Sequence, residues 1–282
     1  MPEGDTIFRT ARTLDRAIGG QTVARFDTQL PGLAVVDRRE AIAGRTVQQV
    51  SARGKHLLIA FSGGLALRTH MRMHGSWHIY RPGERWRAPA RDARIVIVTS
   101  VWVAAAFAVT DAELLSAHGL AHHPRLLALG PDLLSSDPDL EDARARIRSS
   151  GSRHIAEALL AQRSVAGLGN VYKSELLFMF GLHPSTPVSD VPDETMMALL
   201  RRGRDLLRVN AAETSIAAAR TRARMTTGRL NPEASLWVYG RTGRPCRKCG
   251  TTIVSKNETD GRRTYWCPAC QSAHRLAAID SA

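Results

Sequence analysis

The stretch Cys246–Cys270 reads CRKCGTTIVSKNETDGRRTYWCPAC and contains all four cysteines of the 282-residue chain. Its two Cys-x2-Cys pairs, Cys246/Cys249 and Cys267/Cys270, are separated by 17 residues. This spacing allows four thiolates to surround one Zn²⁺ ion tetrahedrally with no open ligand position, so we expect a single structural zinc. Two disulfides are the alternative, which the lack of a secretory signal disfavours.

The segment between the cysteine pairs predicts a β-hairpin, with strands at Thr251–Val254 and Thr264–Trp266. Lys256, Arg262 and Arg263 would lie near its tip, where they could reach phosphate groups. Zinc ribbons also occur in many proteins that have no DNA role. The distribution of charge along this chain argues against that alternative.

The chain is strongly basic, with a formal net charge of +13 and a pI near 10.7. The net charge is +6 over residues 1–133, −1 over residues 134–219 and +8 over residues 220–282. Such a surplus favours a polyanionic partner, above all nucleic acid. Codon bias explains the preference for Arg over Lys but not the surplus itself. No apolar run approaches the roughly 20 residues of a membrane span, so we expect no membrane role.

The second half of the chain is helical in pattern. Helices are expected over Arg153–Gln162 and Val171–Phe180, on either side of the glycine-rich break VAGLGN at residues 165–170. Two helices joined by such a turn form a common clamp for a nucleic-acid backbone. A further helix over Glu194–Val209 should precede an arginine-rich, mobile loop at residues 210–235.

The first half predicts one helix followed by a β-rich region. The helix should begin with Asp5 as its N-cap and end before Gly19. Strands are then expected at His56–Phe61, Leu65–Thr69, Arg94–Thr99 and Val101–Val109, and a linker at Ser135–Asp142.

The first three residues, Met1-Pro2-Glu3, can carry chemistry. If an aminopeptidase removes Met1, Pro2 presents a secondary amine that can attack the sugar carbon of a damaged nucleoside, while Glu3 moves protons. An α-amino group titrates near pH 8, about two units below lysine, so more of it is an unprotonated nucleophile at neutral pH. Proline at position 2 is otherwise common and then signals only methionine trimming.

Five motifs occur in a fixed order: MPEG at 1–4, RGKHLL at 53–58, GLGNVYKSE at 167–175, VYGR at 238–241 with PC at 245–246, and the cysteine pairs. With them the chain resembles the formamidopyrimidine-DNA glycosylase/endonuclease VIII family of bifunctional base-excision enzymes. The resemblance implies an α+β fold. An N-terminal β-sandwich flanked by helices would precede a helical, helix–two-turn–helix domain that ends in a four-cysteine zinc-finger β-hairpin.

The resemblance also implies three catalytic residues. Pro2 is similar to the family nucleophile that attacks C1′, and Glu3 to its proton-transfer partner. Lys55 matches the hairpin lysine that binds phosphate beside the lesion and assists catalysis. A solvated hairpin residue is the alternative for Lys55.

DNA contacts are implied for the helix–turn–helix motif and the zinc hairpin. Asn170 matches the asparagine that clamps the DNA backbone, although it could be only a helix cap, and Lys173 lies in the same motif. Arg262 matches the arginine that holds phosphates beside the flipped nucleotide, with Arg263 adjacent to it.

The turn Arg72-Met73-His74 is where the family inserts residues that fill the gap left by the extruded base. Met73 has the apolar, flexible side chain that a wedge needs. The alternative is that Met73 is buried in a strand. His70 is expected to be structural rather than catalytic.

The chain departs from the family pattern in three places. Asp5-Thr6 lacks the acidic residue expected at position 6. Trp102–Val109 replaces the Asp-x-Arg-Arg-Phe-Gly strand of the formamidopyrimidine branch, and residues 210–230 lack that branch's lesion-capping signature. The last two differences favour the endonuclease VIII branch, which acts mainly on oxidised pyrimidines.

We therefore expect a bifunctional DNA glycosylase and abasic-site lyase with a catalytic domain at 1–133, a linker at 134–142, a DNA-binding domain at 143–240 and a zinc hairpin at 241–275. Its partner would be double-stranded DNA that contains oxidised bases or abasic sites. We expect the enzyme to be a monomer in the bacterial cytoplasm, associated with the nucleoid. The alternatives are a formamidopyrimidine/8-oxoguanine glycosylase, a non-catalytic damaged-DNA-binding protein of the same fold and, more remotely, a zinc-ribbon RNA-binding protein.

Overall fold

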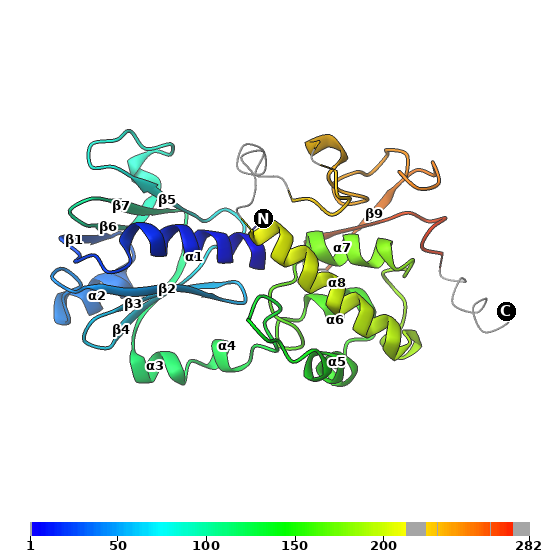
Figure 1. Ribbon diagram of the computed structural model, residues 1–282, viewed down its shortest axis with the longest axis horizontal. Coiled ribbons are helices and arrows are strands. Elements are labelled where there is room, and N and C mark those ends of the chain that lie inside the picture. The colour runs from blue at the N-terminus through cyan, green and yellow to red at the C-terminus, as the bar shows by residue number, and fades with distance from the viewer. Residues whose placement is uncertain (1, 213–223, 230, 260, 273–282) are drawn as a thin grey trace. The chain divides into compact units, whose positions relative to one another are not determined.

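The computed structural model divides the chain into two compact units, Met1–Ala128 and Leu129–Ala282, each with its own hydrophobic core (Figure 1). The residues that it describes are 2–212, 224–229, 231–259 and 261–272. Among them, no helix is both long and apolar enough to cross a membrane.

The N-terminal unit contains two four-stranded antiparallel sheets, ordered β1-β6-β7-β5 and β2-β3-β4-β8. The strands are β1 (Arg25–Thr28), β2 (Val47–Arg53), β3 (His56–Phe61), β4 (Leu65–His70), β5 (Ser76–Tyr80), β6 (Ala93–Val98), β7 (Val103–Phe107) and β8 (Asp111–Ser116). Ile59 and Leu67 of one sheet share a buried cluster with Ile97 and Ala104 of the other. This shared core confirms the predicted β-sandwich.

The helices of this unit are α1 (Gly4–Ile18), α2 (Pro31–Arg39), α3 (Ala117–Ala121) and α4 (Pro124–Leu127), with a 3₁₀ turn η1 at Ala90–Asp92. Helix α1 begins earlier than expected: its N-cap is Glu3, not Asp5, because the Glu3 carbonyl accepts the N–H groups of Thr6 and Ile7 at 2.9 and 3.1 Å. The backbone of Glu3 therefore defines the helix start, although Asp5 carries the better capping side chain.

Helix α1 packs beside β2 and runs antiparallel to it (Figure 1). The Gly20 N–H donates to the Val47 carbonyl at 2.8 Å, and the Asp15 carboxylate accepts the Val50 N–H at 2.7 Å. The first turn of α1 therefore extends toward the end of β2 at Arg53.

The C-terminal unit is mainly helical. Its elements are α5 (Leu140–Ser149), α6 (Ile155–Leu160), α7 (Asn170–Met179), η2 (Val188–Asp190), α8 (Asp193–Ala211), η3 (Pro232–Ala234), β9 (Val254–Asn257) and β10 (Arg263–Trp266). Residues of α5, α6, α7 and α8 form one buried cluster. Helix α7 is buried along nearly its whole length, so it lies at the centre of this unit.

The boundary between the two units lies between Ala128 and Leu129, before the expected linker at 134–142. Leu133 is buried in the C-terminal core, and the Ala166 N–H donates to the Pro131 carbonyl at 2.9 Å. Helix α5 then begins inside the expected linker, at Leu140. The Ser, Asp and Pro content of this segment suggests a spacer, but its leucines pack against the helices.

The zinc hairpin also differs from expectation. Its first strand is Val254–Asn257 rather than Thr251–Val254, and Arg263 pairs with Asn257 across the ladder. Thr251 is not free to join a strand because its carbonyl accepts the Cys246 N–H at 2.8 Å in the first cysteine turn. The predicted strand at Thr264–Trp266 lies within β10.

The expected arginine-rich loop at 210–235 falls partly outside the described residues, which omit 213–223 and 230. Its described part is held by side chains. Asn210 Nδ2 donates to the Met225 carbonyl, and the Met225 N–H donates to Asn210 Oδ1, at 2.9 and 2.8 Å.

Candidate functional site

Pro2 and Glu3 lie at the start of α1, ahead of the first-turn N–H groups of that helix. Pro2 is half-buried and Glu3 is buried. A helix N-terminus carries partial positive charge, which disfavours a protonated amine beside it. This position suits a nucleophilic amine with an adjacent carboxyl group.

Lys55 lies in the two-residue turn between β2 and β3, after Gly54. Gly54 has φ +57°, a left-handed conformation that suits the first position of a tight hairpin turn. Because α1 runs antiparallel to β2, the first turn of α1 extends toward this same end of the sheet. The structure therefore brings Pro2, Glu3 and Lys55 to one end of the N-terminal unit.

The turn at residues 71–75 leaves β4 at the same end, since His70 pairs with His56, the neighbour of Lys55. Arg72, Met73 and His74 are all exposed, and Met73 exposes 52% of its surface. Met73 is thus on a turn and not in a buried strand. Its role as a wedge stays a prediction.

Sequence reasoning missed a network of charged side chains around Arg68 of β4. This guanidinium is 0% exposed and donates to Asp111 at 2.5 Å, to Glu113 at 2.8 Å and to His56 Nδ1 at 3.0 Å. His123 Nε2 donates to Glu113 at 2.9 Å. A lone arginine in the apolar strand LALRTH was the available signal.

Two neighbouring histidines, His56 and His70, are neutral near pH 7. Burial foremost, followed by the charges of His70 and Arg68, lowers the pKa of His56 to about 3. Burial and the charge of Arg72 lower the pKa of His70 to about 4, with a smaller contribution from Lys55. This agrees with the expected structural role of His70, whose Nδ1 accepts the Arg72 N–H at 3.1 Å.

In the C-terminal unit, the glycine-rich break ends at Gly169, which is the N-cap of α7, so Asn170 is the first helical residue rather than the cap. Gly167 adopts φ +99°, a conformation that side chains disfavour. Asn170 is 3% exposed, and its Nδ2 donates to the Arg263 carbonyl at 2.9 Å. This hydrogen bond joins the start of α7 to β10 of the zinc hairpin.

Lys173 is buried, whereas a contact with DNA would need its ammonium group at the surface. It is 1% exposed, and its ammonium group donates to Thr264 Oγ1 at 2.7 Å. This lysine joins α7 to β10 inside the unit. The expected DNA contact is replaced by a structural one, and sequence alone could not distinguish a buried lysine from a surface one in this motif.

Glu175 of the same motif was also missed as a structural group. It is 0% exposed, and its carboxylate accepts the N–H groups of Trp237, Val238 and Tyr239 at 2.7, 2.9 and 2.9 Å. The Thr226 hydroxyl donates to it as well. Glu175 thereby fixes the VYGR motif against α7.

Arg262 is exposed in the loop that precedes β10, where its carbonyl accepts the Glu258 N–H at 2.7 Å. Arg263 begins β10 and donates through Nε to Asn257 at 3.0 Å. The two neighbouring arginines thus have different surroundings. Arg262 is the one on the loop, and its contact with phosphate stays a prediction.

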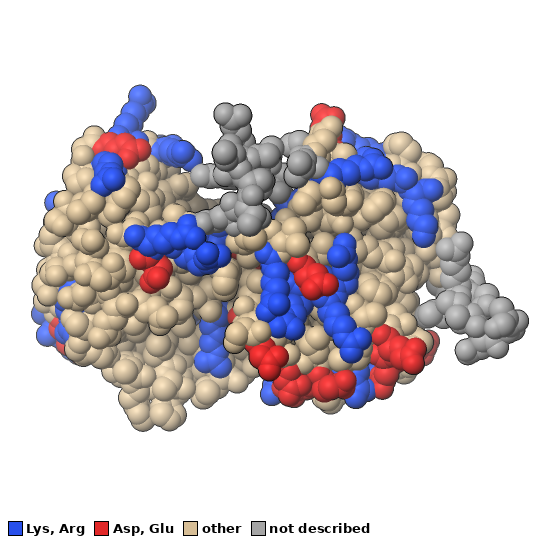
Figure 2. Space-filling view, viewed as in Figure 1, with Lys and Arg blue, Asp and Glu red and all other residues tan. Residues whose placement is uncertain are grey.

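Basic side chains also run along α8 on the face drawn in Figure 2. Arg201 and Arg202 are exposed. Arg204 and Arg208 donate to the Ser136 carbonyl at 2.8 and 3.1 Å and so hold the segment before α5. Part of this basic surface therefore stabilises the unit itself.

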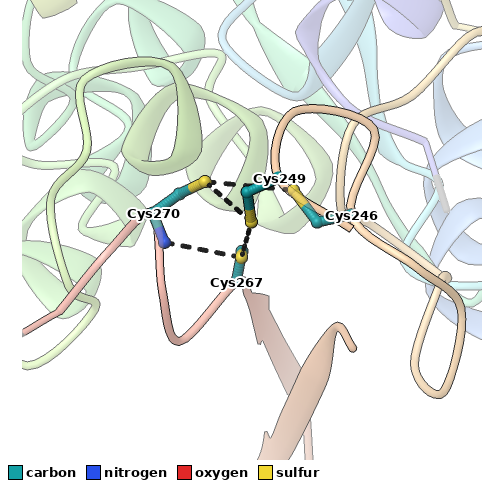
Figure 3. A group of neighbouring side chains, drawn as sticks. All are labelled: Cys246, Cys249, Cys267 and Cys270. Carbon is teal, nitrogen blue, oxygen red and sulfur yellow. Dashed lines mark hydrogen bonds between the residues drawn. The ribbon is translucent and has the colours of Figure 1, made fainter. Parts of the chain in front are cut away.

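The four cysteines converge at one point, with all their sulfur atoms within 4.8 Å of one another (Figure 3). The Sγ–Sγ distances are 4.0 Å for Cys246–Cys270, 3.5 Å for Cys249–Cys267 and 3.4 Å for Cys249–Cys270. A tetrahedron with Zn–S bonds of about 2.3 Å places its sulfur atoms about 3.8 Å apart. The residues fit one structural zinc ion, as the sequence predicted.

Comparison with known proteins decides the family. Residues 1–113 match the formamidopyrimidine-DNA glycosylase N-terminal domain, residues 129–221 its H2TH domain, and residues 243–273 the zinc finger found in FPG and IleRS. A Streptomyces coelicolor protein named probable endonuclease 8 2 is 40% identical over 277 residues, which cover 96% of this chain and 94% of the relative. The chain belongs to the formamidopyrimidine-DNA glycosylase/endonuclease 8 family.

Other members of the family agree along the whole chain. The Mycolicibacterium smegmatis protein named DNA-(apurinic or apyrimidinic site) lyase Nei2 is 39% identical over 273 residues, 97% of this chain and 100% of that protein. The fold matches that of Lactococcus lactis Fpg in a complex with DNA containing an abasic site. The TM-score is 0.78 and the identity 25%, over 96% of this chain and 99% of that one.

Proposed function

We propose that this family member is a bifunctional DNA glycosylase and abasic-site lyase of base-excision repair. One observation carries the proposal: Pro2 and Glu3 directly precede α1, at the same end of the N-terminal unit as Lys55 and the turn 71–75. The resemblance to proteins named endonuclease 8 and abasic-site lyase supports it. The four-cysteine site supplies structure and no chemistry, since it leaves no open ligand position.

In the proposed reaction, the Pro2 amine attacks C1′ of the damaged nucleotide. The C1′–base bond breaks, and its electron pair and a proton leave with the base. The sugar ring then opens: the C1′–O4′ bond breaks, O4′ takes up a proton, and the nitrogen lone pair forms the protein–sugar iminium. Glu3 transfers the protons between the sugar and the amine. Loss of the C2′ proton then expels the 3′ phosphate in β-elimination, and a second, δ-elimination expels the 5′ phosphate. Lys55 would bind the phosphate beside the lesion.

Groups of each unit are proposed to contact the DNA. Met73 would fill the gap left by the extruded nucleotide, flanked by Arg72 and His74. Asn170 at the start of α7 and Arg262 on the hairpin loop would hold the backbone phosphates. Lys173 is left out of this set because its ammonium group donates to Thr264 Oγ1 inside the unit.

We propose oxidised pyrimidines as the main substrates. Several relatives in the comparison are named endonuclease 8, and β7 is buried throughout and carries no basic residue. A formamidopyrimidine/8-oxoguanine glycosylase is the second candidate. Excision rates for thymine glycol or dihydrouracil against 8-oxoguanine opposite cytosine, measured on matched duplexes, separate the two.

We further propose that the enzyme is a monomer. We also propose that it acts in the bacterial cytoplasm, at the nucleoid, because its substrate is chromosomal DNA. Sedimentation of the protein with and without an abasic duplex tests the monomer. A stable dimer in either sample would contradict it.

Borohydride trapping tests the mechanism. Correctly processed protein should form a covalent adduct with abasic duplex, and a permanent N-terminal extension should abolish it, whereas a C-terminal tag should not. Glu3→Gln should lower base excision by about 10²–10⁴-fold. If protein with an N-terminus at Pro2, verified by mass spectrometry, binds abasic duplex but gives neither adduct nor strand cleavage, the chain is a non-catalytic DNA-binding protein.

A further inference from the structure

Asp111 connects the buried part of the N-terminal unit to the exposed turn at 71–75. Its Oδ1 accepts from the buried Arg68 guanidinium at 2.5 Å, while its Oδ2 accepts from Arg72 of the turn at 2.5 Å. Arg125 of α4 donates to the same Oδ2 at 3.2 Å from outside the turn. One carboxylate thus bridges an immobile guanidinium and a side chain of the turn.

The charges of this bridge are permanent near pH 7. Burial by itself raises the pKa of Asp111, but the hydrogen bonds and charges of Arg68 and Arg72 outweigh it and lower the value to about 2. The bridge therefore consists of an ionised carboxylate between guanidinium groups. Such charge-assisted contacts are stronger and more directional than neutral hydrogen bonds.

The turn itself has an unusual backbone. Arg72 has φ +51°, the left-handed region that non-glycine residues adopt only when their surroundings impose it. Its N–H donates to His70 at 3.1 Å, and the Gly75 N–H donates to the Met71 carbonyl at 2.8 Å. At the base of the turn, Trp77 Nε1 donates to Thr69 Oγ1 at 3.3 Å. Met73, which lies between these contacts in the chain, is exposed.

We propose that Asp111 is a positioning residue: through Arg72 it fixes the 71–75 turn so that Met73 is already presented for insertion into duplex DNA. The inference rests on the proposed function, because insertion is needed only by an enzyme that extrudes a nucleotide. Arg68 supports Asp111 from the sheet, and the free protein holds the turn in one conformation before DNA arrives. This preorganisation spares the binding step the cost of ordering the turn.

The test measures insertion directly. The probe is a duplex with a tetrahydrofuran abasic analogue opposite 2-aminopurine, whose fluorescence rises when a side chain enters the gap and unstacks it. The signal is read at saturating protein, with saturation verified by anisotropy, so that affinity does not contribute. Wild type should give the full rise, and Met73→Ala defines the signal without insertion.

Asp111→Asn and Arg72→Ala should each lose most of the rise and excise bases from duplex about tenfold more slowly. Arg72→Ala retains the Arg68–Asp111 pair, so it keeps the proposal testable if Asp111→Asn does not fold. The double variant should lose no more than either single one, because both changes break the same bridge. Arg125→Ala is the matched control and should keep the full signal.

A folded Arg72→Ala protein with the wild-type fluorescence rise would overturn the proposal. So would an Arg125→Ala protein that loses the rise as Arg72→Ala does. Borohydride trapping and strand cleavage of abasic duplex by the wild-type enzyme test the proposed function separately. If both are absent, the proposed function fails; if they are present and the fluorescence result is negative, only the role of Asp111 fails.

Discussion

Both units of the molecule bury charged side chains, but they neutralise them in different ways. In the N-terminal unit the buried Arg68 is paired with the carboxylates of Asp111 and Glu113, which are partly exposed. In the C-terminal unit the buried Glu175 is surrounded by main-chain N–H groups of residues 237–239. The first arrangement joins flexible side chains and extends to the exposed turn 71–75. The second fixes a segment of backbone in place.

The comparison teaches where each unit should be rigid and where it should respond to its surroundings. The position of a carboxylate enclosed by main-chain donors depends on the fold of its own unit. It changes little when charges elsewhere in the molecule change. A network of side chains depends on the ionisation of each member. Perturbations of the two units should therefore have separable effects, which decrease in size in the order that follows.

Removal of zinc should have the largest effect, confined to the C-terminal unit. A structural zinc site contributes on the order of 10 kcal/mol of binding free energy to folding. We expect a chelator to expose the amides of β9 and β10 and of the start of α7, which is joined to β10 through Asn170 and Lys173. Hydrogen exchange followed by mass spectrometry measures this, and added zinc should reverse it. Equal loss of protection in β3 and β4 would contradict the separation of the units.

Glu175→Ala should come next. Three N–H groups, one buried and two partly buried, would lose their acceptor at about 1–3 kcal/mol each, so we expect the free energy of unfolding to fall by about 4 kcal/mol. Denaturant unfolding of the zinc-loaded protein measures the change. The exposed Glu157→Ala on α6 is the control and should change stability by less than about 0.5 kcal/mol. A loss as small as the control's would show that the main-chain donors find water instead.

Acid should weaken the N-terminal unit more steeply than the C-terminal one, in which burial lowers the pKa of His183. His56 and His70 have folded-state pKa values of about 3 and 4, below the ordinary value of 6.5, so the unfolded chain takes up protons first as the pH falls. Stability is then lost from about pH 6.5 downward, by up to roughly 3 kcal/mol per pH unit for the two histidines together. Asp111 adds a further loss below its ordinary pKa of 3.8, toward pH 2.

Amide protection factors, corrected for the intrinsic pH dependence of exchange, measure this loss for β3 and β4 against α7 and α8. His56→Gln cannot take up a proton but keeps an acceptor for Arg68, so it should reduce the slope by about half. Equal slopes in the two units would refute the contrast.

Lys173→Met should have the smallest effect. The methionine fills the same space, and Thr264 loses one hydrogen bond, so we expect a change of about 1 kcal/mol in stability. The salt dependence of DNA binding should stay unchanged because the ammonium group is buried. Arg262→Ala, in contrast, should reduce the slope of log K against log salt by about one. A reduced slope for Lys173→Met would restore that lysine to the DNA interface.

The local chemistry of the sequence predicted the zinc site and the sandwich well. Two cysteine pairs must meet in a tetrahedron, and the strands of the β3–β4 hairpin show an apolar pattern with glycines between them. The surroundings of α7 could not be predicted in the same way. A helix buried on nearly all sides has no periodic polar face, so Lys173 and Glu175 look like surface residues.

The partners of Arg68 lie 43 and 45 residues further along the chain, so no local pattern relates them. They come together because β8, which follows the last strand of the other sheet in the chain, pairs with the edge of β4. The errors at Thr251–Val254 and at the linker have a similar origin. In each case the segment has the local propensity for the predicted conformation, but contacts that form only in the folded unit give it a different one.

The buried Arg68 has one more consequence, for folding. It lies directly opposite Glu113 in the β4–β8 ladder, and side chains alternate between the two faces of a strand. If β8 slipped by one residue, Glu113 and Asp111 would point to the opposite face, and a buried cation would lose both of its carboxylates. Apolar strands alone would tolerate such a slip more easily. Arg68 thus penalises a one-residue slip of these strands and favours the register that forms the site.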